Sequence, residues 1–489
     1  MKLLLKYISL PLFLVTIFFT SCVDENISLD ESLELTFSCD TLIMDTLFAE
    51  QQSATGRFMI YNNNKRALKI SSIRMAGGTS SYFRFNVDGR IAGKGDVLED
   101  IVIKGRDSLF VFVEMTPPST DNQPYITLLD SLIFECNNRV KNVKLMAIGS
   151  DARVLRSAVY TTNATIDSLR PNLVFNHIYV AEGAKLTITE GAKLYMHASA
   201  NIIVDGELEC RGTFEHPIII RGDRFDCIND VDQTPYSQMP NQWGGIYLQN
   251  AQSQHIIENT HIRGSGVGVL LIGANRSEPK LELRNSVIHN SGAYGIYSQQ
   301  GSVVVENSEI SNCGESCIVQ LGGSLRMAHT TVANYYRYAS RKNSSVRILS
   351  YVIQNGTPLY FPITSTVIEN SIIFGSNSEE LELAHDTTST IDYNVLLSHT
   401  LIKGKRLETS NFIDCYWAKS RNERNALDTV FVNTKIDNIA ETGYFNFRLD
   451  SLSHARNLGS TSVANLYPLD LDGKDRNRDN MPDLGAYEK

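Results

Sequence analysis

Two stretches of the chain repeat one another at an interval of 22 residues. The first reads Arg284-Asn-Ser-Val-Ile-His-Asn-Ser-Gly-Ala-Tyr-Gly-Ile296, and the second reads Glu306-Asn-Ser-Glu-Ile-Ser-Asn-Cys-Gly-Glu-Ser-Cys-Ile318. Asparagine, isoleucine and glycine recur at equivalent positions, and looser copies of the pattern lie on either side. Repetition at a short fixed period is typical of a solenoid, in which each repeat stacks on its neighbours.

One such repeat holds two or three short strands with their turns, because a strand rises about 3.3 Å per residue. It is too short for a strand–helix–strand crossover and shows no helical periodicity. A chain that returns every 22 residues pairs each strand with its copy in the next coil. The repeat therefore predicts a parallel β-helix over residues 170–400.

Equivalent positions of these predicted coils should lie above one another. We expect a buried aliphatic column that contains Ile262, Ile288 and Ile310. We also expect a ladder of stacked amides at a turn, formed by Asn259, Asn285 and Asn307. Residues 333–365 depart from the repeat and are expected to form a loop or an irregular coil.

Several segments resemble a known family. Glu182-Gly-Ala-Lys-Leu-Thr-Ile-Thr-Glu-Gly-Ala-Lys-Leu-Tyr195 and Gln242-Trp-Gly-Gly-Ile246 are similar to the opening coils of right-handed parallel β-helix proteins. Pro482-Asp-Leu-Gly-Ala-Tyr-Glu488 resembles the closing segment of secreted β-helix proteins of Bacteroidetes, which implies closing coils and a C-terminal cap over residues 401–489. The resemblance implies a right-handed β-helix, and crossovers between parallel strands are right-handed in nearly all proteins. It implies little about activity.

Residues 36–150 alternate short runs of strand-forming residues with turns. Leu68–Met75 is followed by Gly77-Gly78, and Tyr82–Val87 leads into Asp88-Gly89. Turns at a spacing of about ten residues predict a β-sandwich. The segment resembles the immunoglobulin-like modules of secreted bacterial proteins. The predicted fold class is therefore all-β, with an N-terminal immunoglobulin-like β-sandwich followed by a right-handed parallel β-helix.

The first 21 residues have the features of a secretory signal: a positive start, a short apolar core and small residues at the end. The end, Phe19-Thr-Ser-Cys22, resembles the lipobox of bacterial lipoproteins. The resemblance implies a lipoprotein signal peptide over residues 1–21, acylation of Cys22 and a tether over residues 22–35. It thus predicts a membrane partner reached through a lipid anchor, and the alternative is an ordinary secretory signal with an incidental cysteine.

The acidic stretch that follows the cysteine, Val23-Asp-Glu-Asn26, resembles the surface-export signal of Bacteroidetes lipoproteins. It implies an outer-membrane protein exposed at the cell surface. An inward-facing outer-membrane anchor is the alternative.

The composition excludes other classes of protein. Hydrophobic residues make up 42% of the chain and charged residues 20%, so the chain is globular rather than disordered. The formal net charge is -9 and no block of lysine or arginine stands out, so nucleic acid is not an expected partner. Two disulfides are conceivable, Cys39–Cys136 and Cys313–Cys317. The alternative is that these cysteines are small buried hydrophobic residues.

Many right-handed β-helix proteins are polysaccharide lyases or glycoside hydrolases, which need acidic residues in fixed places. Residues 233–385 contain no aspartate, and one predicted column alternates in charge as Glu258, Arg284 and Glu306. The sequence therefore favours a non-catalytic rod that binds a glycan or a protein partner, with no catalytic residue assigned. The alternative is a carbohydrate-active enzyme that uses glutamate and a loop acid such as Asp386 or Asp392.

Two acidic segments and three tyrosines are candidate binding residues. Calcium ligands are conceivable at Asp226, Asp230 and Asp232 and at Asp470 and Asp472, although solvated or structural loops explain both segments without a metal. No other cofactor is expected. Ring faces for a sugar are offered by Tyr247, Tyr294 and Tyr297, and the alternative is a structural role in a coil wall.

Overall fold

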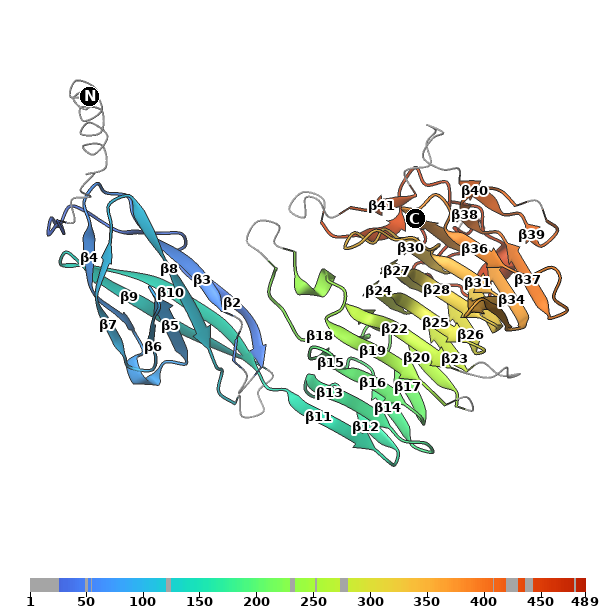
Figure 1. The fold of residues 1–489 in the computed structure, drawn as a ribbon, viewed down its shortest axis with the longest axis horizontal. Helices are drawn as coiled ribbons and strands as arrows, with labels where there is room; N and C mark the ends of the chain where they lie inside the picture. Colours follow the sequence, from blue (N-terminus) through green and yellow to red (C-terminus); the bar gives the residue numbers. More distant parts are fainter. Residues whose placement is uncertain are drawn as a thin grey trace, which may run out of the picture. The chain divides into compact units, whose positions relative to one another are not determined.

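The computed structural model describes residues 26–48, 52–53, 55–119, 125–228, 234–250, 253–272, 280–407, 409–418, 430–435, 443–478 and 481–489. The chain divides into two compact units between Asp151 and Ala152. Regular structure in both is almost entirely β-strand, as Figure 1 shows. No helix of the described residues is long and apolar enough to cross a membrane. The predicted signal peptide and Cys22 lie outside these residues.

The first unit is a sandwich of two five-stranded sheets. One sheet has the strand order β1 (Thr36–Phe37), β3 (Gly56–Asn62), β8 (Asp107–Met115), β5 (Phe83–Val87) and β6 (Arg90–Ala92). The other has the order β2 (Thr41–Phe48), β10 (Arg139–Ser150), β9 (Ile126–Cys136), β4 (Leu68–Met75) and β7 (Val97–Ile103). The two inner faces supply one buried core, so the predicted immunoglobulin-like β-sandwich is confirmed.

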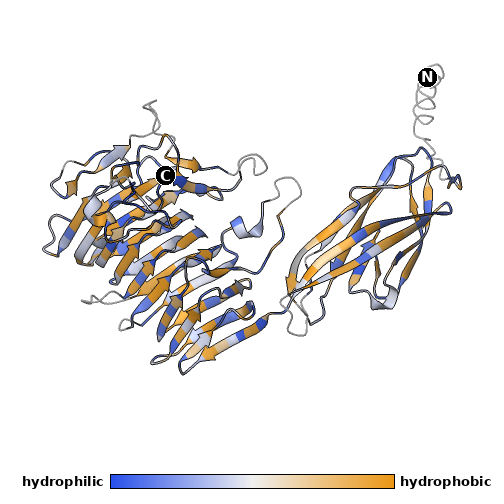
Figure 2. Cartoon of the chain, turned by 180° about the vertical axis from the view of Figure 1, so that it is seen from behind, coloured by the Kyte–Doolittle hydropathy of each residue, from blue (hydrophilic) through white to orange (hydrophobic). Residues whose placement is uncertain are grey.

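Side chains along the strands of the sandwich alternate between the core and the solvent. On β10 the side chains of Val143, Leu145 and Ala147 are fully buried, whereas Lys144 is exposed. The same alternation appears as hydrophobic and hydrophilic residues in turn along many strands of Figure 2. It follows from the period of two residues with which side chains change face along a strand.

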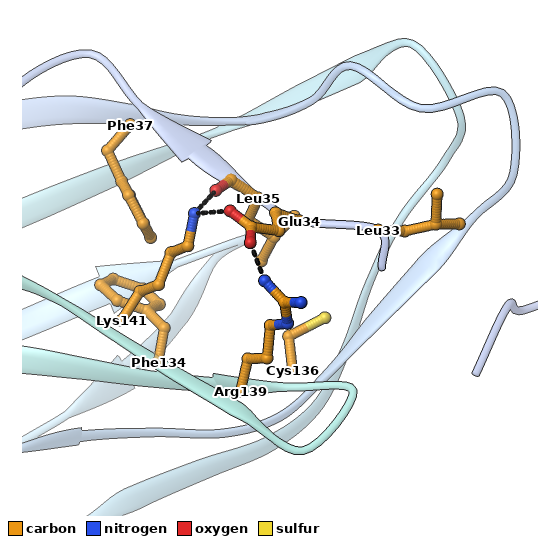
Figure 3. A pocket seen from close by; sticks show the side chains of 8 residues that line it. All are labelled: Leu33, Glu34, Leu35, Phe37, Phe134, Cys136, Arg139 and Lys141. Carbon is orange, nitrogen blue, oxygen red and sulfur yellow. Dashed lines mark hydrogen bonds and ion pairs between the residues drawn. The ribbon is translucent and has the colours of Figure 1, made fainter. Parts of the chain in front are cut away.

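Part of the predicted tether packs against this sandwich. Ile27 forms a bridge with Ala67, and Leu35 is buried. The carboxylate of Glu34 accepts hydrogen bonds from Arg139 and from Lys141, the latter at 2.6 Å, beside a cavity of only about 10 Å³ (Figure 3). A cavity of this size has room for one water molecule at most, so the sandwich has no ligand pocket there.

The second unit is a parallel β-helix whose coils have three faces. The ten-stranded sheet is the first face and contains β12 (Ala164–Ile166), β14 (Lys185–Thr189), β17 (Glu207–Arg211), β20 (His255–Glu258), β23 (Leu281–Arg284), β26 (Ser302–Glu306), β29 (Gly323–Ala328), β34 (Ile363–Glu369), β37 (Tyr393–Ser398) and β39 (Phe412–Ile413).

The eighteen-stranded sheet folds over the other two faces, and β11 (Arg153–Tyr160) and β13 (Asn172–Val180) run along both. The second face contains β15 (Lys193–Met196), β18 (Ile218–Gly222), β21 (Thr260–Arg263), β24 (Val287–Ser291), β27 (Glu309–Cys313), β30 (Thr331–Asn334), β35 (Ile372–Gly375), β38 (Leu401–Lys403) and β40 (Tyr416–Ala418). The third face contains β16 (Asn201–Val204), β19 (Trp243–Leu248), β22 (Ser265–Ile272), β25 (Tyr294–Gln299), β28 (Ser316–Leu321), β31 (Val346–Leu349) and β36 (Leu381–Ala384).

The interior of the β-helix is the predicted stack of aliphatic columns. Ile262 pairs with Ile288, which pairs with Ile310, and all three side chains are fully buried. The coils begin at β11, before the predicted start at residue 170, and they end at β40, within the residues 401–489 that were predicted to hold closing coils. Each strand satisfies its backbone groups with its copy one coil away, which is why a 22-residue repeat is sufficient for the fold.

The corner between the first and second faces is built by residues with a left-handed backbone. Asn259, Asn285 and Asn307 have φ angles of 45°, 47° and 46°. Asparagine adopts this conformation at lower cost than most residues with a side chain. The Nδ2 of Asn307 also donates a hydrogen bond to the Oδ1 of Asn285 at 2.8 Å, so adjacent coils form the predicted amide ladder here.

Residues 335–345 form the loop expected within the irregular segment. The next residues return to the coil as β31, and an antiparallel hairpin follows, formed by β32 (Tyr351–Gln354) and β33 (Thr357–Tyr360). The hairpin's Val352 packs with Leu321 and Leu349 on the outside of the third face. The irregular segment therefore adds a cover to one face and does not interrupt the stack.

Residues 443–489, named the closing segment here, lie along the outside of the second face. They include β42 (Asn446–Leu449), which pairs with β41 (Phe431–Asn433), and the short helix α3 (Thr461–Ala464). The C-terminus lies beside β30 in Figure 1, where Ala486 N donates to Thr331 Oγ1 at 2.9 Å. Tyr487 donates its hydroxyl proton to Glu309 Oε2 at 2.6 Å, so the segment is joined to two coils.

The described cysteines carry free thiols. Cys39, Cys136, Cys313 and Cys317 are among them, so neither conceivable disulfide is present. Cys313 and Cys317 are fully buried in the core of the β-helix. These cysteines therefore serve as small apolar residues.

Candidate functional site

Tyrosines gather on the outside of the third face. The β-helix register aligns one position of five successive strands, occupied by Tyr179, Ile203, Tyr247, Leu270 and Tyr297. Every second residue of this column is a tyrosine. The structure therefore brings together Tyr247 and Tyr297, which the sequence separates by 50 residues.

The column points away from the core. Ile246 and Leu248 on either side of Tyr247 are fully buried, and so is Ile296 beside Tyr297. All members of the column are partly exposed. Because strands in a sheet lie about 4.8 Å apart, the tyrosines follow one another at about 10 Å along the stack.

Tyr294 extends the surface sideways on strand β25. Its ring centroid lies 5.1 Å from that of Tyr297, with an interplanar angle of 52°. Burial raises the pKa of Tyr297, and the neighbouring Tyr294 adds to this effect. The hydroxyl of Tyr297 is therefore a neutral group at physiological pH that can donate or accept a hydrogen bond.

The column is bounded on one side by the hairpin β32–β33. The next residue after Tyr297 in the register is Val319, which is buried in the cluster under the hairpin. Beyond it come Arg347 and Glu382, which form an ion pair at 2.6 Å. The column together with Tyr294 is named the tyrosine surface here. This surface consists of partly exposed aromatic and aliphatic side chains, and it ends at the hairpin β32–β33.

Three residues of the tyrosine surface were predicted from the sequence, whereas Tyr179 was not. The hydroxyl of Tyr179 donates to Asp205 Oδ2 at 2.6 Å, which fixes the ring at the second coil. Tyr179 lies outside the regular repeat, so the spacing of residues alone did not align it with Tyr247. Only the strand register of the structure shows that a tyrosine recurs at every second coil.

The first candidate calcium segment is only partly described. Asp226 forms an ion pair with Arg224 at 2.5 Å, and Asp230 and Asp232 lie outside the described residues. Within the part of the chain that the structure describes, no group of three or more histidine, cysteine, aspartate or glutamate side chains is arranged to hold a metal ion. Calcium at Asp226 stays a prediction.

The second candidate calcium segment is a loop of the closing segment with its carboxylates already engaged. Asp470 accepts backbone hydrogen bonds from Asp472, Lys474 and Glu488 at 2.6–2.9 Å. Asp472 forms two hydrogen bonds of 2.6 Å with Arg448. These contacts give both carboxylates a role in shaping the loop, and calcium there also stays a prediction.

The charged column of the first face, Glu258, Arg284 and Glu306, has opposite charges on neighbouring coils, as its sequence predicts. Arg284 lies between Glu258 and Glu306 in the register and donates to Glu306 at 2.8 Å. Burial raises the pKa of Glu306, but hydrogen bonds from Tyr467 and Arg284 leave it below the ordinary value. Glu306 is therefore a carboxylate held by its neighbours.

Asp386 and Asp392, the loop acids considered for an enzyme, lie at one coil corner. A hydrogen bond of 2.6 Å from the Tyr360 hydroxyl, with two more from Thr388, lowers the pKa of Asp386 to about 2. A carboxylate with this pKa stays ionised at neutral pH. It is therefore unsuited to donate a proton to a leaving group.

Comparisons with known proteins agree with this architecture. Residues 244–397 match the family model described as right handed beta helix region. Comparison with curated proteins finds no match.

Among solved structures, the A-module of mannuronan C-5 epimerase AlgE6 from Azotobacter vinelandii is similar, with 12% identity and a TM-score of 0.29, over 55% of this chain and 91% of that one. A PapD-like domain of human CEP192 has 8% identity and a TM-score of 0.17, over 27% and 94%. A family 123 glycoside hydrolase from Clostridium perfringens has 6% identity and a TM-score of 0.17, over 25% and 30%, so the chain spans less than a third of that enzyme. The strand topology and the family match show an all-β protein in which an immunoglobulin-like β-sandwich precedes a right-handed parallel β-helix.

Proposed function

We propose that this protein is a lipid-anchored protein of the outer membrane that binds a glycan on the tyrosine surface of its β-helix. The alignment of Tyr179, Tyr247 and Tyr297 at every second coil is the observation that carries the proposal. A regular row of partly exposed aromatic rings on a rigid sheet is a preorganised surface, so binding costs little conformational entropy. Tyrosine also combines a large apolar ring with a polar hydroxyl.

The row favours an extended chain molecule as the ligand. Ring faces accept the apolar C–H faces of sugars, and the hydroxyl groups bond to the sugar hydroxyls at the edges. The separation of about 10 Å between successive tyrosines is comparable with the length of two sugar residues in an extended glycan. A glycan that runs along the stack would therefore place alternate residues on tyrosines and the others on Ile203 and Leu270.

Removing one ring from the row should weaken binding without loss of the fold. We expect Tyr297→Ala or Tyr247→Ala to reduce affinity for a cognate glycan about tenfold, because one aromatic contact contributes about 0.5–1.5 kcal/mol beyond its buried area. The measurement is titration calorimetry with a panel of soluble acidic and neutral oligosaccharides.

Tyr125→Ala is the matched control, since Tyr125 is an exposed tyrosine of the sandwich. Equal affinity of the Tyr297→Ala protein and the unaltered protein for every bound glycan would refute the proposed surface. The same incubations should be analysed for reducing ends and unsaturated uronates. Their appearance would favour the carbohydrate-active enzyme over the binding protein.

The lipid anchor is supported by the sequence Phe19-Thr-Ser-Cys22 and by the apolar run before it. Several acyl chains on one residue hold a protein stably at a membrane, whereas a single chain binds only marginally. We therefore expect Cys22→Ser to move the protein from the membrane fraction to the soluble fraction of cells. Membrane association that survives the substitution would contradict lipidation at Cys22. Protease digestion of intact cells separates a surface-facing anchor from an inward-facing one.

A further inference from the structure

A second cavity lies where the closing segment meets the amide ladder. It has a volume of about 560 Å³ and is lined by the corner of three coils, by the loop 213–217 of the preceding coil and by residues 469–473 of the closing segment. Cavities of roughly 300–1,000 Å³ are typical of small-ligand sites. This corner cavity is distinct from the tyrosine surface, because it lies on the first and second faces of the coils.

The amide ladder supplies the polar floor of the corner cavity. Asn259 donates to the backbone oxygen of Gly212 at 3.1 Å, and Asn307 donates to Asn285 at 2.8 Å. Asn307 Oδ1 in turn accepts a hydrogen bond of 2.6 Å from the buried Arg476. Each amide is thus held in one orientation, as a site that reads hydroxyl and amine groups requires.

An aromatic ring forms one wall of the corner cavity. The side chain of Phe214 is 58% exposed, although large apolar side chains are usually covered. Gly473 lies against it: a Cβ at this position would sit 3.1 Å from the ring. Gly473 also has a φ of 78°, a backbone conformation that favours glycine, and any larger residue would have to shift the ring.

One carboxylate of the corner cavity remains open to a ligand. Glu215, Asp470 and Asp472 line the cavity, but Asp472 is paired with Arg448 and Asp470 accepts backbone hydrogen bonds, so the exposed Glu215 is the acid that a ligand can meet. The imidazole of His261 also lines the cavity, and burial, with a smaller effect of Arg263, lowers its pKa to about 4. His261 is therefore neutral at physiological pH and does not offset the charge of Glu215.

We propose that the corner cavity binds an amine-bearing sugar residue, with its ring face on Phe214, its hydroxyls at the amides and its ammonium beside Glu215. The proposal rests on the proposed glycan-binding function and names a second subsite with its own chemical class. An ammonium is attracted to a carboxylate beside it at the surface, and dissolved salt screens this attraction. A uronic acid or a sulfated sugar in the same position would be repelled by Glu215.

The test is titration calorimetry of the detergent-solubilised full-length chain with three probes: oligomers of glucosamine, of N-acetylglucosamine and of galacturonic acid. The glucosamine oligomer should bind most tightly, and its affinity should fall as salt is raised. Glu215→Gln should weaken it about fivefold to tenfold, and Phe214→Ala by a similar factor. Glu190→Gln is the matched control, because Glu190 is an exposed glutamate at the same corner one coil earlier and should leave affinity unchanged.

The two proposals fail in different ways. If the glucosamine oligomer binds no better than the other two, or if Glu215→Gln has no effect, the corner cavity is not an amino-sugar site. If Tyr247→Ala and Tyr297→Ala then still lower the affinity for a glycan, the tyrosine surface is supported and only the corner cavity is refuted. If no probe and no glycan of the wider panel binds, both proposals are overturned.

Discussion

Replacing Arg341 by methionine should destabilise the β-helix by about 3–5 kcal/mol. Arg341 and Glu380 form an ion pair whose side chains are 1% and 0% exposed, with two hydrogen bonds of 2.6 and 2.7 Å. Methionine fills much of the same volume but leaves the carboxylate of Glu380 buried without its countercharge. The remaining donors are neutral: Ser345 through its backbone and hydroxyl, and the backbone of Asn377.

The measurement is urea unfolding followed by tryptophan fluorescence. The chain has two tryptophans, Trp243 and Trp417, and both belong to the β-helix, so the signal reports this unit alone. Arg341→Lys should have an intermediate effect, because lysine keeps the charge and loses the paired geometry.

Arg347→Met is the matched control. Arg347 pairs with Glu382 in neighbouring strands, but the two side chains are 22% and 37% exposed. An exposed pair contributes about 0–1 kcal/mol. Comparable losses for Arg341→Met and Arg347→Met would show that burial does not set the strength of the first pair.

Acid should weaken the β-helix from about pH 6.5 downwards, because several of its histidines are buried as neutral groups. The raised pKa of Glu488, about 7, acts in the opposite direction, but it is one group against several. His255 is completely buried, and burial together with the nearby Lys280 lowers its pKa to about 3. His329 is also buried, and its pKa is lowered by burial and by Arg476. Both stay neutral in the folded state, whereas the unfolded chain takes up protons near pH 6.5.

The sign of the effect follows from proton linkage. Because the folded pKa of His255 is depressed, its contribution is fully present above about pH 6.5 and is lost as the pH falls towards about 3. Between pH 6.5 and 4.5 the loss is about 2–3 kcal/mol for this one residue. The urea midpoint from tryptophan fluorescence should therefore be clearly lower at pH 4.5 than at pH 7.

His255→Asn separates this titration from other effects of acid. The Nδ1 of His255 accepts a hydrogen bond from the backbone of Leu208 at 3.1 Å, and the amide oxygen of asparagine can take its place. The variant should be less stable than the unaltered protein at pH 7, because a smaller side chain leaves a cavity. The difference should shrink at pH 4.5, and a constant difference would contradict a buried neutral histidine.

Most of the architecture could be predicted from the sequence because the β-helix is periodic. A strand and its copy one coil away share a sequence spacing, so the column of Ile262, Ile288 and Ile310 follows from the 22-residue interval. The asparagines of the corner follow as well, since a left-handed backbone position favours this residue. Tyr179 was missed because it lies before the regular repeat, and the hairpin β32–β33 was missed because an insertion has no period.

The sequence alone determined the order of the units, the stacking of the coils and the alternating charge of Glu258, Arg284 and Glu306. These properties depend on local spacing and on pairs of residues one repeat apart. Only the tertiary structure decided where the closing segment lies, and with it the corner cavity. Contacts such as Tyr487 with Glu309 join residues 178 positions apart, and no repeat relates them. Their position is set by side-chain packing and burial, which sequence spacing does not encode.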